Sequence, residues 1–165
     1  MFIRPATAAD ANQIIDVHFA AVHVTASSSY PLGVLDDWSR QPDNDRYELM
    51  RQAIERDDEV HVVAEEDSRV VGWGCVLPML QEIRGVYVHP AFGRRGAGSN
   101  ILAHLEYVAL CRGIEELRLD SSLNAEIFYQ RNGYEVVDRA MHRLANGLEM
   151  ASVKMKKRLR QPSGV

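Results

Sequence analysis

Residues 82–111 read EIRGVYVHPAFGRRGAGSNILAHLEYVALC, and this stretch decides the fold. An apolar segment at 86–88 ends at His89-Pro90, a glycine-rich loop follows at 93–98, and apolar residues then recur with the 3.6-residue period of a helix. The order is strand, glycine loop, helix. Because the first four amides of a helix lack intrahelical partners and carry partial positive charge, the loop predicts a cradle for an anion.

The composition of the loop narrows what it can bind. Gly96 and Gly98 lack the Cβ atoms that would hold a ligand away from the amides, and Arg94 and Arg95 add positive charge at the rim. A Walker A loop ends in Gly-Lys-Ser/Thr, and this loop contains no lysine. A dinucleotide fingerprint would need a third small residue where Ile101 stands. A glycine turn that only caps the helix stays open as the alternative.

Length and charge set the broad class of protein. The chain has 165 residues, 46% hydrophobic and 25% charged, so we expect a single globular domain over 1–160 with a tail at 161–165. The net charge of −4 argues against nucleic acid as a main partner, because binding phosphates needs a basic face. The basic run at 154–160 is the exception. We interpret it as solvated charge at the chain end, and its use in nucleic-acid binding stays open.

Cysteine usage and hydropathy bear on metal binding and on location. Cys75 and Cys111 are the only cysteines, and they lie in apolar segments without metal-ligand spacing. We therefore expect reduced thiols and no metal. No apolar run approaches the roughly 18 residues of a membrane span, and the first residues do not resemble a signal peptide. A cytoplasmic protein without membrane contact is expected.

Hydrophobic periodicity predicts the remaining elements. Polar and turn-forming residues at 25–33 predict a loop. Strands are expected at 2–6, 59–65, 69–80, 81–88 and 117–121, and helices at about 14–22, 34–38, 43–56, 101–109 and 125–131.

The glycine loop resembles that of the GNAT acyltransferases. Their pattern Gln/Arg-x-x-Gly-x-Gly/Ala falls on 93–98 after a strand ending in Tyr-Val-x-Pro, although Gly93 departs from its first position. A second GNAT pattern, Asn-x-x-Ala-x-x-Phe/Leu-Tyr-Glu-Lys-x-Gly-Phe, is similar to 122–134. Here Ser122 replaces the asparagine and Tyr134 the last phenylalanine. Two motifs in the right order are more specific than either one alone.

The resemblance extends over residues 2–157 and implies both a fold and an activity. The fold is α/β (α+β), with a mixed, mostly antiparallel sheet of about seven strands and helices on both faces. The activity is direct transfer of an acetyl group from acetyl-CoA to a primary amine of a small molecule or peptide. Acetyl-CoA, the only cosubstrate expected, would enter a cleft between the fourth and fifth strands.

The resemblance also implies site residues. Tyr129 corresponds to a thiol-facing tyrosine that acts as general acid, and Glu82 to a strand carboxylate that accepts the amine proton through water. Tyr30 and Trp38 are candidate acceptor contacts. The alternatives are a core aromatic for Tyr129, a surface ion pair for Glu82, and scaffold roles for the other two. Cofactor contacts are expected from Val86, Tyr87, Val88, Arg94, Arg95, Gly96, Ala97, Gly98, Ser99, Ser122 and Phe128.

Two further questions stay open from the sequence. The identity of the acceptor is not predicted, although an acidic chain is compatible with a polycationic acceptor such as a polyamine. The alternative function is a non-catalytic acyl-CoA-binding sensor or adaptor, against which the joint presence of Tyr129 and Glu82 argues. A homodimer is neither required nor excluded.

Overall fold

The computed structural model describes residues 1–159, so the tail expected at 161–165 lies outside the described residues. Seven strands and five α-helices follow one another along this part of the chain. The elements are β1 (Phe2–Pro5), α1 (Ala11–Ala20), α2 (Leu32–Trp38), α3 (Asn44–Glu55), β2 (Val60–Glu66), β3 (Arg69–Leu77), β4 (Glu82–Val88), α4 (Ala97–Cys111), β5 (Glu116–Ser122), α5 (Glu126–Arg131), β6 (Glu135–Arg143) and β7 (Glu149–Arg158).

The strands form one sheet in the order β1-β2-β3-β4-β5-β7-β6. Neighbouring strands are antiparallel except β4 and β5, which run parallel. The predicted mixed, mostly antiparallel α/β fold is therefore confirmed. Within residues 1–159, no helix is both long and apolar enough to cross a membrane.

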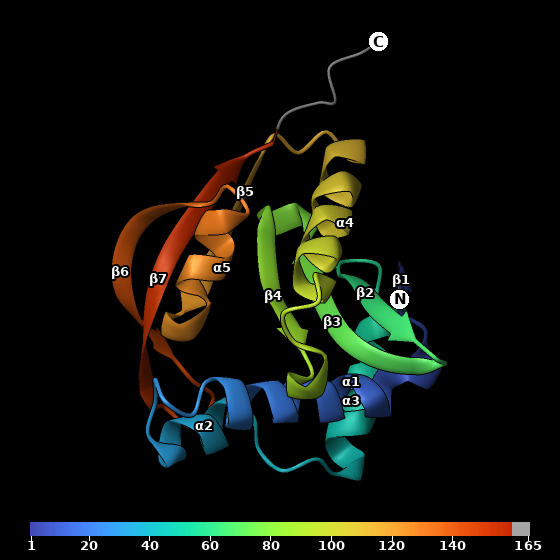
Figure 1. Ribbon diagram of the computed structural model, residues 1–165, viewed down its shortest axis with the longest axis vertical. Coiled ribbons are helices and arrows are strands. Elements are labelled where there is room, and N and C mark those ends of the chain that lie inside the picture. The colour runs from blue at the N-terminus through green and yellow to red at the C-terminus, as the bar shows by residue number, and fades with distance from the viewer. Residues whose placement is uncertain (160–165) are drawn as a thin grey trace.

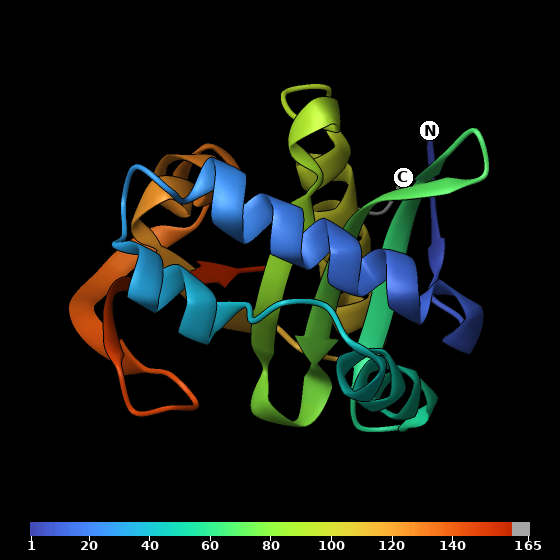
Figure 2. The ribbon, with the colours of Figure 1, turned by 90° about the horizontal axis from the view of Figure 1, so that it is seen from below.

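Helices cover both faces of the sheet (Figure 1). On one face, α4 buries Ile101 and Leu105 completely against the sheet, and α5 lies beside it. On the other face, α1 crosses the strands, with α2 and α3 alongside (Figure 2). Ile14 and Val17 of α1 pack there against Trp73 of β3. The two faces hold separate apolar clusters, as expected for a sheet buried on both sides.

The separation of β4 from β5 is the feature that creates a site. Only one residue pair, Glu82 with Arg118, joins these strands, and it lies at the start of β4. The rest of β4 remains paired with β3 on its other side, through Val88 opposite Gly72. Among the described residues, the β5 side of this half of β4 has no strand partner. Backbone groups along 86–88 therefore border an open space between the two halves of the sheet.

The basic run near the C-terminus requires a correction. Lys154, Lys156 and Arg158 are exposed, as interpreted from the sequence, whereas Lys157 is half-buried and pairs with Glu106 at 2.7 Å. Residues up to Arg158 belong to β7, which is paired with both β5 and β6. Val153 and Met155 are buried, whereas Lys154 lies on the exposed face, 3.3 Å from Asp120. This alternation with a period of two is that of a strand with one solvated face. The run is thus part of the sheet, and Arg160 lies outside the described residues.

Candidate active site

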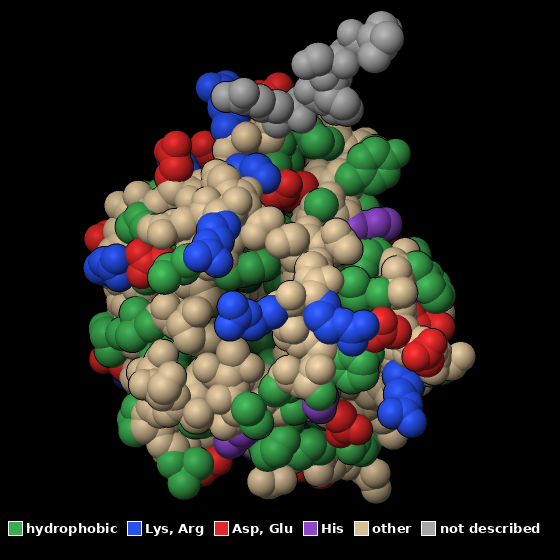
Figure 3. Space-filling model, in the orientation of Figure 1, with side chains coloured by type: hydrophobic (Ala, Val, Ile, Leu, Met, Phe, Trp, Pro, Cys, Tyr) green, Lys and Arg blue, Asp and Glu red, His purple; other side chains and the backbone are tan. Residues whose placement is uncertain are grey.

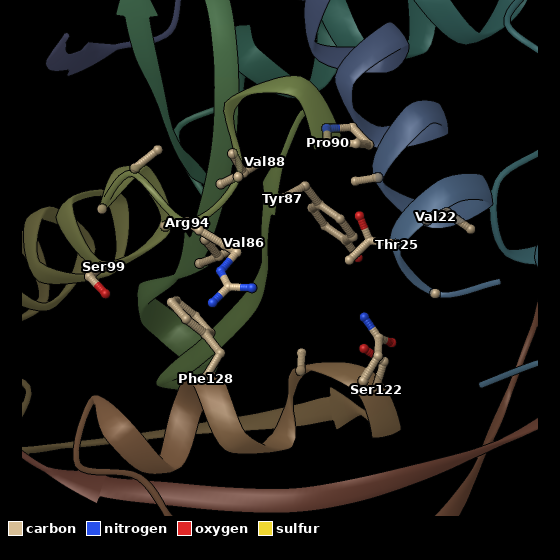
Figure 4. A pocket seen from close by; sticks show the side chains of 18 of the residues that line it. Val22, Thr25, Val86, Tyr87, Val88, Pro90, Arg94, Ser99, Ser122 and Phe128 are labelled. Carbon is tan, nitrogen blue, oxygen red and sulfur yellow. The ribbon is translucent and has the colours of Figure 1, made fainter. Parts of the chain in front are cut away.

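A cleft of about 480 Å³ lies where β4 and β5 separate. Figure 4 shows its two sides: Arg94, Ser99 and Phe128 on one, Thr25 and Val22 on the other, with Tyr87 reaching toward Thr25. The first side comes from the glycine loop, α4 and α5, and the second from the end of α1. The cleft therefore passes between helices that pack on opposite faces of the sheet.

The beginning of α4 forms the cradle predicted from the glycines. Gly96 is the N-cap, with φ of 84°, a conformation that glycine adopts without strain. The first backbone bond of the helix runs from the Asn100 amide to the Gly96 carbonyl, so the amides of Ala97, Gly98 and Ser99 precede it. All three of these residues line the cleft. The arrangement offers amide donors and the positive end of the helix dipole to an anion.

The two arginines of the loop differ in position. Arg94 has a left-handed backbone, with φ of 61°, and its guanidinium points into the cleft near Phe128 (Figure 4). Arg95 instead donates to Glu66 at 2.8 Å and lies over the Phe92 ring, and it does not line the cleft. Lys and Arg side chains lie in the middle of this face, near where α4 begins (Figure 3). Of the two predicted contacts, only Arg94 has direct access to a ligand in the cleft.

The three predicted residues of β4 all line the cleft but point to different faces. Val86 and Val88 pack on the α4 side, whereas Tyr87 packs with Trp73 on the α1 side, their rings stacked at 5.4 Å. This follows from alternation along a strand. Backbone groups along the open edge of β4 are thus available to a ligand that runs between the strands.

The second motif supplies the part of the cleft wall on the β5 side of the opening. Ser122, at the end of β5, and Phe128, on α5, both line the cleft, as does Asn124 between them. Tyr129 follows Phe128 but is buried, with its ring 5.7 Å from that of Tyr134. Burial is the main cause that raises the pKa of the Tyr129 hydroxyl; nearby Tyr87 raises it further and the Val86 backbone lowers it. Tyr129 does not itself line the cleft, although its hydroxyl lies near the Val86 backbone at the edge of β4. The raised pKa keeps this hydroxyl protonated at neutral pH.

Glu82 does not line this cleft. It borders a second hollow of about 350 Å³, together with Arg118, Asp120 and Lys154. Because its register partner Leu77 packs with Trp73, Glu82 faces the α1 side of the sheet, as Tyr87 does. At about 3.3 Å per residue, it lies roughly 13 Å along β4 from Val86. The structure thus places Glu82 and Tyr129 at separate points and does not bring them together.

The two candidate acceptor contacts also differ. Trp38, at the end of α2, lines the cleft. Tyr30 is buried, and its hydroxyl donates to the Ala151 carbonyl at 2.6 Å and accepts from the Leu123 amide at 2.8 Å. One bond connects the segment before α2 to β7 and the other connects it to the turn after Ser122, which indicates that Tyr30 positions this turn instead of contacting a ligand.

Sequence reasoning missed the contribution of the end of α1. The helix continues as a π-helical turn over Ala21–Thr25, where a loop was expected from Thr25 onward, and Ala21, Val22 and Thr25 line the cleft. The Ala26 amide bonds the Val22 carbonyl, which keeps the turn helical. Widened helical turns are frequent at functional sites. The sequence did not predict this one, because the Thr and Ser residues of the segment are typical of a turn.

A polar network lies behind Tyr87. Nδ1 of His18 accepts hydrogen bonds from Ser39 Oγ at 2.9 Å and from Arg46 Nη2 at 3.3 Å, and its ring centroid is 4.4 Å from that of Tyr87. Burial, followed by the charges of Arg46 and His23, lowers the pKa of His18 to about 3. His18 is therefore neutral at physiological pH and supports the ring of Tyr87 from inside the protein.

His18 is expected to make the fold sensitive to acid. Its folded pKa of about 3 lies below the ordinary value of 6.5, so between these values the unfolded state binds the proton and the folded state does not. The free energy of unfolding should fall by about 1.4 kcal/mol per pH unit as the pH drops through this window. Urea unfolding at several pH values should show this slope, and it should be shallower in His18→Asn. Equal slopes in the two proteins would contradict it.

One cluster within residues 1–159 has three potential metal ligands, Glu59, His61 and Cys75. The Trp73 indole donates to Nδ1 of His61 at 3.2 Å, which leaves the imidazole proton on Nε2, 3.0 Å from a Glu59 carboxylate oxygen. A metal at Nε2 would move that proton to Nδ1, against the indole N–H. Burial raises the pKa of Cys75 to about 12, so the thiol stays protonated. These residues fit a hydrogen-bonded core network and not a metal site.

Comparison with known families decides the relationship. The family model described as the acetyltransferase (GNAT) family matches residues 20–134 of the 165. The chain belongs to the GNAT acetyltransferase family. It is therefore an acyltransferase, as the two motifs implied, and the matched region includes both sides of the cleft. No curated protein sequence matches the chain.

Solved structures of other GNAT proteins have the same fold. A GCN5-related N-acetyltransferase from Rhodopseudomonas palustris superposes with a TM-score of 0.85 and 24% identity, over 96% of this chain and 95% of that one. The PaiA N-acetyltransferase from Thermoplasma acidophilum, solved in complex with coenzyme A, gives 0.78 and 22%, over 96% and 98%. The aminoglycoside 6'-N-acetyltransferase from Enterococcus faecium gives 0.66 and 16%, over 99% and 100%. At such identities, the likeness establishes the fold.

Proposed function

We propose that this GNAT protein transfers an acetyl group from acetyl-CoA directly to a primary amine of a small molecule or peptide. The observation that carries the proposal is the cleft between the separated strands β4 and β5, which ends at the free amides of α4. A pyrophosphate suits the amides of Gly98 and Ser99 with Arg94 beside them, and an extended arm suits the open edge of β4. The PaiA enzyme of the same fold was solved with coenzyme A, which supports this cosubstrate.

The reaction sets three requirements on the chain. The amine nitrogen attacks the thioester carbonyl carbon, a C–N bond forms, and the C–S bond breaks to give a thiolate. The attacking amine must be uncharged and must lose a proton, the carbonyl oxygen must be polarised, and the thiolate must gain a proton. The backbone at the open edge of β4 supplies N–H groups for the carbonyl oxygen.

Tyr129 is our candidate for the proton that the thiolate requires. Its hydroxyl lies near the Val86 backbone, at the edge that an extended arm would follow, and burial keeps it protonated. With so high a pKa, full transfer to a thiolate is unfavourable in isolation, so the hydroxyl acts by donating a hydrogen bond as charge develops on sulfur.

Glu82 is our candidate for the proton acceptor, acting through a chain of water molecules. It faces the same side of the sheet as Tyr87, where the amine would approach. Glu82 lies in the second hollow. Strand β5 borders both spaces, because Asp120 lines the second hollow and Ser122 lines the main cleft. A distance of roughly 13 Å along β4 from Val86 rules out direct contact with the reacting amine there.

Replacement of Glu82 by Gln is expected to lower kcat/KM most below about pH 7, where an amine with an ordinary pKa near 10 is mostly protonated. At about pH 9, solution supplies more free amine, and the deficit should shrink. Measuring kcat and kcat/KM across this range checks the prediction. Asp120→Asn, in the same hollow but on β5, is the matched control and should show no such pH dependence.

Two outcomes would remove Glu82 from this role. A deficit confined to KM and independent of pH would mean that the carboxylate attracts the substrate without accepting its proton. No deficit at any pH would mean that solvent or another group accepts the proton. His142 is a poor substitute, because it is exposed on β6 with its Nδ1 3.6 Å from Asp120 and does not line the cleft.

Thiol release from acetyl-CoA in the presence of a broad panel of amines tests the function itself. The proposal predicts amine-dependent thiol release that saturates with at least one primary amine. Tight binding of acetyl-CoA without thiol release for any amine would instead support a sensor or adaptor module.

A further inference from the structure

We propose that the acceptor is a monoamine with a flat apolar body, an arylalkylamine by chemical class, and not a polyamine or an aminoglycoside. The inference rests on the proposed function of the cleft. It follows from the acceptor wall, which we define as the cleft residues on the α1 side of the sheet: Ala21, Val22, Thr25, Ala26, Trp38 and Tyr87.

The acceptor wall presents aromatic surface held from behind. The rings of Trp38 and Tyr87 are 6.3 Å apart, and Tyr87 is stacked on Trp73 at an interplanar angle of 12°. His18 packs edge-on against Tyr87, and Tyr30 packs edge-on against Trp38 at 5.9 Å. Such a fixed aromatic surface favours a planar apolar group, which can stack on it at little cost in side-chain entropy.

The acceptor wall contains no charged side chain. Among the described residues that line the cleft, Arg94 alone is charged, and it lies on the other side, opposite Thr25 (Figure 4). The acids nearest in sequence to Trp38 point elsewhere. Asp36 lies 3.9 Å from His23, and Asp37 accepts a hydrogen bond from the Asn146 amide at 3.1 Å. Neither residue lines the cleft.

The second hollow does not supply the missing negative charge. Its lining includes Glu82 and Asp120, but also Arg118, Lys154 and Lys156, so basic groups outnumber acidic ones. Lys154 already pairs with Asp120 at 3.3 Å. Arg118 and Lys156 pair with Glu116 at 3.2 and 3.8 Å. A long polyamine that extended from the cleft into this hollow would therefore meet carboxylates that already have basic partners, apart from Glu82.

The charge of the acceptor is therefore the discriminating property. An amine loses its own charge before attack, and until then an ammonium can rest over Trp38 or Tyr87 through cation–π attraction. A polyamine or aminoglycoside would bring further ammonium groups that remain charged and would be desolvated without carboxylate partners. The acceptor wall thus accepts one amine on an apolar body and rejects additional positive charges.

The test compares phenethylamine, propylamine, spermidine and kanamycin as acceptors for the wild-type chain by thiol release. We expect kcat/KM for phenethylamine to exceed that for spermidine and for kanamycin by at least about tenfold. Trp38→Leu should reduce the preference for phenethylamine over propylamine at least about fivefold. A wild-type preference for spermidine or kanamycin would overturn the inference and leave the proposed function standing.

A variant that is expected to gain activity toward spermidine tests the charge argument directly. Thr25 is exposed on the acceptor wall, so Thr25→Glu adds a carboxylate to the cleft with little risk to folding. We expect kcat/KM for spermidine to rise above wild type in Thr25→Glu and to be at least about tenfold higher there than in Thr25→Gln, which has the same shape without the charge. An equal rise in both variants, or none in Thr25→Glu, would contradict the charge argument.

Failure of the proposed function gives a different result. If no amine releases thiol, calorimetry of the four amines with the protein saturated with coenzyme A still measures selectivity. Binding of phenethylamine at least about tenfold tighter than that of spermidine supports the acceptor wall as argued, and equal or weaker binding overturns it.

Discussion

Tyr129→Phe is expected to lower the turnover of acetyl transfer about 100-fold, the lower end of what a positioned proton donor contributes. The variant keeps the ring that packs 5.0 Å from Phe128 and removes only the hydroxyl near the Val86 backbone. Affinity for acetyl-CoA should therefore hold, and the free energy of unfolding should change by about 1 kcal/mol, the usual contribution of one hydrogen bond. Single-turnover rates with saturating amine measure the effect.

Tyr134→Phe is the matched control for Tyr129→Phe. Tyr134 packs against Tyr129, and neither residue lines the cleft. The Tyr134 ring faces the ammonium of Lys157, 5.6 Å from the ring centre, whereas the Tyr129 hydroxyl lies near the Val86 backbone. Loss of its hydroxyl should leave turnover within about twofold. If Tyr129→Phe also stays within twofold, Tyr129 is a core aromatic and water protonates the thiolate.

Gly98→Val is expected to weaken acetyl-CoA binding at least about tenfold, because a β-branched side chain would occupy the cradle. A Cβ atom at Gly98 would lie 3.1 Å from Phe128 and 3.6 Å from Val88, closer to the first than side chains normally pack. The substituent would narrow the cleft between α4 and α5 and hold a ligand away from the first amides of the helix. Calorimetric titration with acetyl-CoA measures the loss.

Gly33→Val is the matched control that tests whether weakened acetyl-CoA binding is specific to a substitution in the cradle. Gly33 lies on α2, and a Cβ atom there would meet nothing within 4 Å, so binding should not change. Circular dichroism and thermal unfolding establish that Gly98→Val is folded. A folded Gly98→Val protein with wild-type affinity would show that the helix start is only a turn, the alternative that the sequence leaves open.

Local sequence signals predicted most of the fold. Gly96 and Gly98 before the apolar period of α4 identified the helix start, because a glycine-rich turn followed by a 3.6-residue apolar period is typical of a loop that leads into a helix. The hairpin of β2 and β3 followed from alternation on both sides of Asp67-Ser68, which occupy left-handed turn positions. β7 was harder to predict, since its charged face resembles a solvated chain end, although Val153 and Met155 alternate with lysines.

The site depends on relations that a sequence does not display. The segment 86–88 has the composition of a buried strand, so the expected cleft between the fourth and fifth strands came from the family resemblance and not from local composition. The single pair between Glu82 and Arg118 shows where β4 leaves β5. Because β4 separates from β5 along its length, Val86 lines the main cleft, whereas Glu82, at the start of the same strand, lies in the second hollow. Thr25 enters the site because α1 continues through a π-turn, which depends on tertiary packing more than on local propensity.

The most direct test of the proposed transfer follows the acetyl group itself. Acetyl-CoA carrying an isotopic label in the acetyl group is incubated with the protein and phenethylamine, and the products are analysed by mass spectrometry and thiol titration. Direct transfer predicts labelled N-acetylphenethylamine in equal amount to the thiol released, with no label retained on the protein. Label found in free acetate, or on the protein without an acetylated amine, would contradict direct transfer in the cleft.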